Sequence, residues 1–151
     1  SDKDLFQLVG EKVKVLDTMK EKIFDEAAVI EKFGVKPSQI GDYLSLVGDA
    51  SDNVPGAKGI GPKAAQKLLG QFETLAKVYE NIESISGSVK DKLVASRADV
   101  DLSKKLVSLN LGLESSFVEE KYKGPQLEAL QSFFMSLEMK SLVNKFNGYS
   151  S

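Results

Sequence analysis

Residues 48–69 read GDASDNVPGAKGIGPKAAQKLL, and this stretch predicts the fold around which the rest of the chain is built. Two aspartates three residues apart lead into a turn with three glycines and a proline, and a lysine-rich helix follows. Pro62 suits the first helical position, because proline lacks the N–H group that would have no partner there. A helix ending at Val47-Gly48 precedes the turn, so the pattern predicts a helix-hairpin-helix.

The glycine turn is suited to an anion such as a phosphate. Backbone N–H groups at the start of the second helix point out of the turn, and glycines let a ligand approach the backbone closely. Lys58, Lys63 and Lys67 surround the turn, and no acidic residue occurs between Asn53 and Phe72. The alternative is a plain tight connection between two helices, with the lysines on a solvated face.

A second acidic pair stands at the beginning of the chain, in SDKDLFQLV. Asp2 and Asp4 are two residues apart, so an extended backbone would point both to the same side. Leu5, Leu8 and Val9 follow at helical spacing, which predicts that Asp2 lies at a strand end and Asp4 begins a short helix. The alternative is that both acids only cap this helix. If this pair meets Asp49 and Asp52, four like charges repel unless a divalent cation or a proton intervenes.

Composition excludes several classes of site. The 151 residues include no cysteine and no histidine, so disulfides, thiolate or imidazole metal sites and histidine-based catalysis are excluded. Metal chemistry would have to use carboxylates and a hard cation such as Mg²⁺ or Mn²⁺. The net charge of −2 limits nucleic-acid binding to a local basic patch. A chain without cysteine and without a long apolar run is expected in the cytoplasm and not in a membrane.

The segments GDASDNVPGAKGIGPKAA and DKDLFQLV resemble signatures of the structure-specific 5′-nucleases, in particular the 5′→3′ exonuclease domain of bacterial DNA polymerase I. The resemblance implies an incomplete two-metal site for Mg²⁺ or Mn²⁺ at Asp2, Asp4, Asp49 and Asp52, with no catalytic residue beyond these ligands. It also implies K⁺ binding by hairpin carbonyls. The DNA-binding residues that it implies are Gly56, Lys58, Gly59, Ile60, Gly61, Lys63 and Lys67.

The expected fold is mostly α, with a short β-hairpin near the N-terminus, and corresponds to the C-terminal part of a larger α/β 5′-nuclease domain. Residues 1–24 are expected to end the α/β core, 25–147 to form a helical DNA-binding domain with its hairpin at 48–69, and 148–151 to be a disordered tail. The β-hairpin is placed at 12–19 and 23–24, and an irregular segment at 111–123. Helices are expected over 25–33, 37–47, 62–69, 72–79, 89–95 and 99–109. A helix pair or one bent helix is expected over 125–146, with its apolar side chains in the core.

The predicted function is a segment of a Mg²⁺-dependent 5′→3′ exonuclease or flap endonuclease that acts on DNA in replication and repair. We expect the segment alone to be inactive, monomeric, and covalently continuous with an upstream nuclease half, and the sequence leaves open whether a polymerase follows. Its predicted partner is double-stranded or 5′-flap DNA, held through the phosphate backbone. The alternative is a non-catalytic helix-hairpin-helix module that binds duplex DNA without sequence specificity. A third interpretation is a structural domain that binds no nucleic acid.

Overall fold

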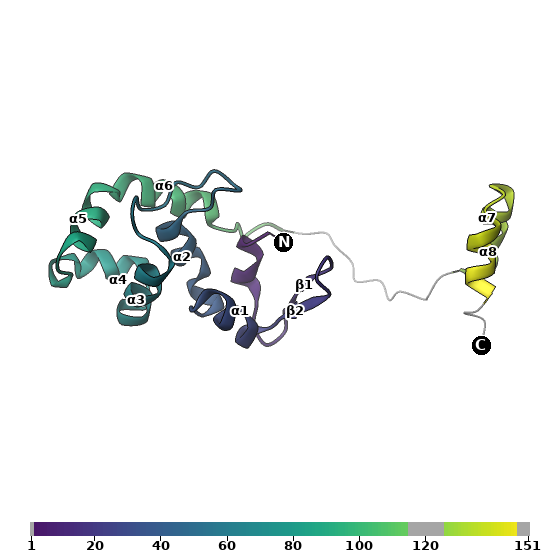
Figure 1. Ribbon diagram of the computed structural model, residues 1–151, viewed down its shortest axis with the longest axis horizontal. Helices are drawn as coiled ribbons and strands as arrows, with labels where there is room; N and C mark the ends of the chain where they lie inside the picture. The colour runs from purple at the N-terminus through teal and green to yellow at the C-terminus, as the bar shows by residue number, and fades with distance from the viewer. Residues whose placement is uncertain (1, 115–125, 148–151) are drawn as a thin grey trace. The chain divides into compact units, whose positions relative to one another are not determined.

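The computed structural model describes residues 2–114 and 126–147, which form parts of two compact units, Ser1–Leu111 and Gly112–Ser151. The first unit contains η1 (Asp4–Leu8), β1 (Val15–Asp17), β2 (Lys22–Phe24), α1 (Glu26–Phe33), η2 (Pro37–Gln39), α2 (Ile40–Val47), α3 (Pro62–Phe72), α4 (Leu75–Glu80), η3 (Ile82–Ser84), α5 (Ser88–Ala95) and α6 (Arg97–Val107) (Figure 1). The second contains α7 (Leu127–Ser136) and α8 (Lys140–Asn147). The predicted class, mostly helical with one short β-hairpin, is confirmed. The predicted domain boundaries stay predictions, although residues 1–24 and the hairpin share the first unit.

Three aromatic rings fix the N-terminal segment. β1 and β2 pair antiparallel, with Leu16 opposite Ile23, and this places the Phe24 side chain in the core. The ring of Phe6 on η1 lies 5.0 Å from the ring of Phe24 and 5.2 Å from that of Phe33 on α1, measured between centroids. Packed aromatic rings bury much apolar area and prefer such tilted contacts. The cluster therefore anchors η1, and with it Asp4, against the rest of the unit.

The helices before the glycine turn form as their sequence signals predict. Asp25 caps α1, since its side chain accepts a hydrogen bond of 2.9 Å from the backbone N–H of Ala28. Gly34 ends α1. Pro37 begins the 3₁₀ turn η2, which runs directly into α2. The helix predicted over 37–47 is thus η2 followed by α2.

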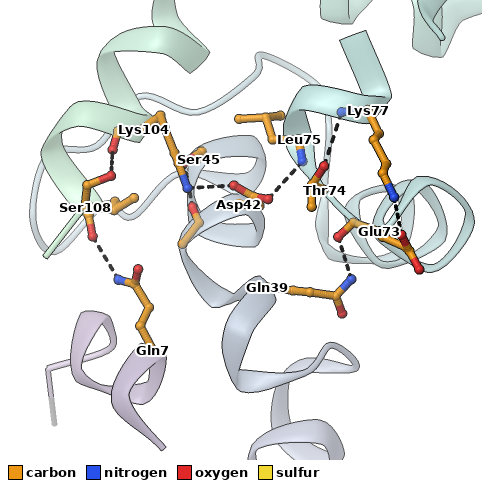
Figure 2. Close-up of polar contacts among 12 residues, drawn as sticks. Gln7, Gln39, Asp42, Ser45, Glu73, Thr74, Leu75, Lys77, Lys104 and Ser108 are labelled. Atoms are coloured by element: carbon orange, nitrogen blue, oxygen red, sulfur yellow. Dashed lines mark hydrogen bonds and ion pairs between the residues drawn. The ribbon is translucent and has the colours of Figure 1, made fainter. Parts of the chain in front are cut away.

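The helix predicted over residues 72–79 is wrong at its start. α3 continues to Phe72, the backbone breaks at Glu73, where φ is +67°, and α4 begins at Leu75. The side-chain amide of Gln39 donates hydrogen bonds to the carbonyl of Leu69 (3.0 Å) and to that of Glu73 (2.8 Å; Figure 2), which satisfies the end of α3. Thr74 caps α4, and a side chain more than thirty residues away in sequence helps to hold this boundary.

The glycine turn closes by a direct contact between backbones. Gly48 and Gly56 both have positive φ, +80° and +66°. A Cβ atom on Gly56 would lie 2.4 Å from the backbone N of Gly48, so only glycine allows this approach. The Ala57 N–H then reaches the Leu46 carbonyl at 2.8 Å, and the side chains of Val54, Ala57 and Ile60 are buried. The turn is thereby tied to the end of α2.

The second unit differs from the expectation that its apolar side chains form core. No side chain of α7 is buried, and Phe133 is 57% exposed. A pair of short helices has too little surface to enclose a core between them. Three other predictions fall outside what the structure describes: burial of the Phe146 side chain, the disordered tail at 148–151, and most of the irregular segment at 111–123. Within 2–114 and 126–147, each helix is too short or too polar to span a bilayer.

Replacing Gly56 with alanine tests the backbone contact. We expect Gly56→Ala to lower the free energy of unfolding by about 2–4 kcal/mol, because the new Cβ meets backbone atoms and the positive φ strains an L-residue. Gly70→Ala is the matched control, since Gly70 is an exposed residue of α3 with no atom within 4 Å of the new Cβ. That variant should gain up to about 1 kcal/mol. Urea unfolding followed by circular dichroism measures both, and equal stabilities would contradict the interpretation.

Candidate functional site

Asp49, near the start of the turn, forms an ion pair with Lys3 in which the aspartate is buried and the lysine is partly exposed. The Lys3 Nζ atom lies 2.6 and 2.7 Å from the two carboxylate oxygens of Asp49 and 3.1 Å from the Ser51 hydroxyl. The backbone N–H and the hydroxyl of Ser51 also donate to Asp49, at 3.0 and 2.5 Å. Burial by itself would raise the pKa of the Asp49 carboxyl, but the hydrogen bonds from Lys3 and Ser51 together outweigh burial and lower it. Asp49 is therefore ionised and neutralised by a lysine.

Asp2, Asp4 and Asp52 share the electrostatic neighbourhood of Asp49. Burial raises the pKa of Asp4, and the negative charges of Asp2, Asp52 and Asp49 raise it further, against the opposing charge of Lys3. Asp2 also accepts a hydrogen bond of 3.0 Å from the Asp4 backbone N–H, as the capping alternative expects. The two acidic pairs, 45 or more positions apart in the sequence, thus lie close enough for their charges to interact.

The four aspartates do not form a closed ligand shell. In the parts of the chain that the structure describes, no three acidic side chains are grouped closely enough to hold a metal ion. Lys3 occupies both oxygens of Asp49 instead. Asp2, Asp4, Asp49 and Asp52 as metal ligands therefore remain a prediction.

The second half of the turn divides into buried and exposed positions. Gly56 and the Ile60 side chain are buried, so they anchor the turn and leave only backbone atoms for a ligand. The exposed positions are Lys58, Gly59, Gly61, Lys63 and Lys67. Gly61 precedes Pro62 without any side-chain cap, and no atom lies within 4 Å of its missing Cβ. The N-terminus of α3 is thus uncapped and open at Gly61.

Two lysines of the site carry no signal in the sequence. Lys3 stands between the two N-terminal aspartates, and its contact with Asp49 spans 46 positions. Lys92 of α5 places its Nζ atom 3.2 Å from the Gly59 carbonyl, across 33 positions. Helical spacing assigns Lys92 to a solvated face, and only the packing of α5 beside the turn brings it there.

Asp42 fixes the first arm of the turn to two other helices. Its carboxylate accepts hydrogen bonds from the Lys104 Nζ atom on α6 (2.7 Å) and from the backbone N–H of Leu75 on α4 (2.9 Å) (Figure 2). The Gln7 side chain on η1 donates to the Val107 carbonyl at the end of α6 (2.8 Å). The site therefore joins an acidic N-terminal segment, a glycine-lined turn between two helices, and a group of lysines beyond that turn.

Comparison with known protein families identifies the class. The family model described as 5′-3′ exonuclease, C-terminal SAM fold, matches residues 35–129. The chain belongs to this 5′-3′ exonuclease family.

Two relatives place the chain within longer proteins. The 5′-3′ exonuclease of Aquifex aeolicus (strain VF5) is 42% identical over 146 residues, which cover 95% of this chain and 50% of that protein. The thermostable DNA polymerase I of Thermus thermophilus is 37% identical over 148 residues, which cover 97% of this chain and 17% of the polymerase. The chain spans about half the length of the first relative and less than a fifth of the second.

Solved structures share the fold. A bacteriophage T5 5′-exonuclease with bound divalent metal ions (zinc) matches with a TM-score of 0.62 and 22% identity, over 70% of this chain and 40% of that one. A bacteriophage T5 flap endonuclease in a complex with DNA and metal ions matches with the same TM-score, identity and coverage. The resemblance to the C-terminal part of a 5′-nuclease domain is thus confirmed for the fold.

A double-mutant cycle tests the Lys3–Asp49 pair. We expect Lys3→Met and Asp49→Asn to show a favourable coupling energy of about 1–2 kcal/mol in urea unfolding, because the pair is charged, hydrogen-bonded and buried on the Asp49 side. The control is the pair of Arg97 and Asp101, joined at 2.9 Å with both side chains about half exposed. Its cycle should give about 0.3–0.5 kcal/mol. If the two coupling energies are equal, Lys3 does not neutralise a buried carboxylate.

Proposed function

We propose that this chain is the DNA-binding and partial metal-site segment of a Mg²⁺-dependent 5′→3′ exonuclease or flap endonuclease that acts on DNA in replication and repair. The observation that carries the proposal is that one turn has carboxylates at its start and exposed, positively charged positions at its end. Asp49 and Asp52 lie in its first part, and the exposed Gly61 and Lys63 lie where it enters α3. A nuclease needs such proximity, because the phosphate that it holds must lie near the phosphate that it cleaves.

The exposed part of the turn is proposed to hold the DNA backbone. The amides at the uncapped start of α3 lie beside Gly61, where nothing hinders a phosphate, and Lys58, Lys63 and Lys67 add positive charge. Lys92 adds a further ammonium group at Gly59. These groups recognise phosphates and not bases, so the proposed binding to double-stranded or 5′-flap DNA is independent of sequence. K⁺ at the hairpin carbonyls belongs to the same proposal.

The acidic part of the turn fits a hard divalent cation by its chemistry. Carboxylate oxygens are the donors that Mg²⁺ and Mn²⁺ prefer, and Asp49 and Ser51 already hold a cation, the Lys3 ammonium. We propose Asp2, Asp4, Asp49 and Asp52 as ligands, directly or through water. A bound Mg²⁺ would supply Lewis-acid activation of a phosphodiester. Lys3 would then have to release Asp49, and its ammonium would become available to a phosphate.

The length of the relatives supports the proposal that the whole protein contains more of the site. The chain covers half of the Aquifex aeolicus exonuclease and a small part of the Thermus thermophilus polymerase. We therefore propose continuity with an upstream nuclease half in a monomeric protein, and with a downstream polymerase if the whole protein is built like the Thermus thermophilus relative.

The alternative, a non-catalytic module that binds duplex DNA, has one observation in its favour. Lys3 neutralises Asp49, and Asp2 accepts a hydrogen bond from the Asp4 N–H, so two of the four aspartates already have structural partners. The two functions differ in their response to metal ions, which the second of the experiments below measures.

Binding to a fluorescent DNA duplex tests the phosphate-binding turn. We expect weak binding that falls with salt and is equal for unrelated sequences. Gly61→Val should weaken it more than Lys67→Ala, since the first blocks approach to the backbone and the second removes one screened charge. Because Gly61 borders open space at φ −96°, its substitution should leave the melting temperature unchanged. Lys63→Ala should reduce the salt slope by about 0.9, the value for one phosphate contact. If the affinity changes neither with salt nor in Gly61→Val, the turn does not bind the phosphate backbone.

Thermal melts with and without Mn²⁺ test the metal site. At tenfold excess over its Kd, Mn²⁺ should stabilise the fold by about 1.4 kcal/mol. Asp4→Asn combined with Asp52→Asn should abolish this effect and raise the metal-free melting temperature, because it relieves repulsion. Asp49→Asn should instead lower the metal-free value, because it removes the partner of Lys3. Asp101→Asn, on the exposed face of α6, is the control. A double variant that responds to Mn²⁺ like wild type would favour the non-catalytic module.

A further inference from the structure

Two serine hydroxyls, one on α6 and one at the residue directly before it, accept hydrogen bonds from backbone amides of the turn. The Gly56 N–H donates to the Ser103 Oγ atom at 2.9 Å, and the Lys58 N–H donates to the Ser96 Oγ atom at 3.1 Å. The Ser103 side chain is fully buried, and Ser96 is 5% exposed. Gly56 is buried, so its amide needs an acceptor that water cannot easily replace, whereas Lys58 is an exposed residue whose bond to Ser96 is partly buried.

The two serines contact the turn from the same side of α6. Ser96 is the N-cap residue of α6, and Ser103 lies within the helix seven residues later, which is about two helical turns. The Ser103 hydroxyl also donates to the Asp99 carbonyl at 2.7 Å. Its hydrogen is therefore used within α6, and its lone pairs are directed toward Gly56.

α6 is itself held in place by contacts with α2 and with η1. Lys104 pairs with Asp42 on α2, the helix that leads into the turn, and Gln7 of η1 donates to the Val107 carbonyl (Figure 2). Ser103 thus lies on a helix whose position is fixed relative to the acidic segment, and Ser96 directly precedes that helix. The two serines transmit that position to the backbone of the turn.

We propose that Ser96 and Ser103 are positioning residues for the phosphate-binding turn. By holding the Gly56 and Lys58 amides inward, they set the course of the backbone into Gly59 and Gly61, whose exposed atoms are to meet the DNA. Neither serine is a DNA contact, since both are buried. This inference rests on the proposed function, and it assigns to α6 a role that the turn's own sequence does not contain.

Alanine and threonine variants in the full chain test the proposal. Ser103→Ala and Ser96→Ala should each weaken duplex binding about fivefold, the effect of misplacing one hydrogen-bonded segment. Ser96→Thr keeps the hydroxyl and should restore binding. The matched control is Ser45→Ala, because Ser45 is equally buried and donates to the Gly41 carbonyl at 2.6 Å but contacts no amide of the turn. It should bind DNA like wild type.

Amide hydrogen exchange separates positioning from a general loss of stability. In Ser103→Ala, exchange at Gly56 should accelerate about tenfold more than at Gly48, whose amide donates to the Leu44 carbonyl at 2.8 Å. In Ser96→Ala, the same should hold for Lys58. Equal acceleration at all amides would overturn the positioning role. If Ser103→Ala does not fold, the Ser96 variants decide the question.

The outcomes also distinguish this inference from the proposed function. Wild-type chain that shows no salt-dependent DNA binding overturns the proposed function and this inference with it. Salt-dependent binding by wild type that is weakened by Lys63→Ala but unchanged in both serine-to-alanine variants overturns the positioning role alone. Weakened binding with selective amide exchange, and rescue by Ser96→Thr, supports both.

Discussion

The backbone contact between Gly48 and Gly56 is the constraint on which the rest of the site depends. With no Cβ at position 56, the chain folds back onto the end of α2 and Ala57 can bond to Leu46. This closure keeps the start of the turn near η1, where Asp4 senses the charges of Asp49 and Asp52. It sends the rest of the turn toward α5 and α6. One sterically demanding contact thereby separates an acidic end from a basic end within about a dozen residues.

Local signals in the sequence predict much of this fold. Asp25, Gly34 and Pro62 mark helix ends by backbone chemistry that acts within a few residues, and the structure has helices that begin or end there. The β-hairpin and the glycine turn are predicted for the same reason. The break at Glu73 has one local signal, the N-cap residue Thr74 of α4, but its hydrogen bond from Gln39 could not be predicted this way. The prediction that the apolar side chains of the second unit form core fails for another reason. Helical spacing of apolar residues predicts a buried face but does not show what would bury it.

The candidate site shows the same division between local and distant effects. Which residue types gather at the turn follows from the sequence, but their charge balance does not. A view of four aspartates alone predicts repulsion that a metal ion or a proton must relieve, whereas the structure relieves it at Asp49 with Lys3. Ile60, expected at the DNA surface, has its side chain in the core. The sequence of an irregular turn does not show which of its side chains are buried in the core and which are exposed to a ligand.

The dependence of the turn on α6 limits how the motif can be transplanted. The amides of Gly56 and Lys58 are satisfied by hydroxyls 47 and 38 positions away, and Asp42 of the first arm is neutralised by a lysine 62 positions away. A synthetic peptide spanning only α2, the turn and α3 would carry every residue of the recognisable signature and none of these hydrogen-bond partners. An engineer who grafts this signature onto a new scaffold must therefore also supply a helix with one hydroxyl at its N-cap and a second hydroxyl seven residues later, placed behind the loop.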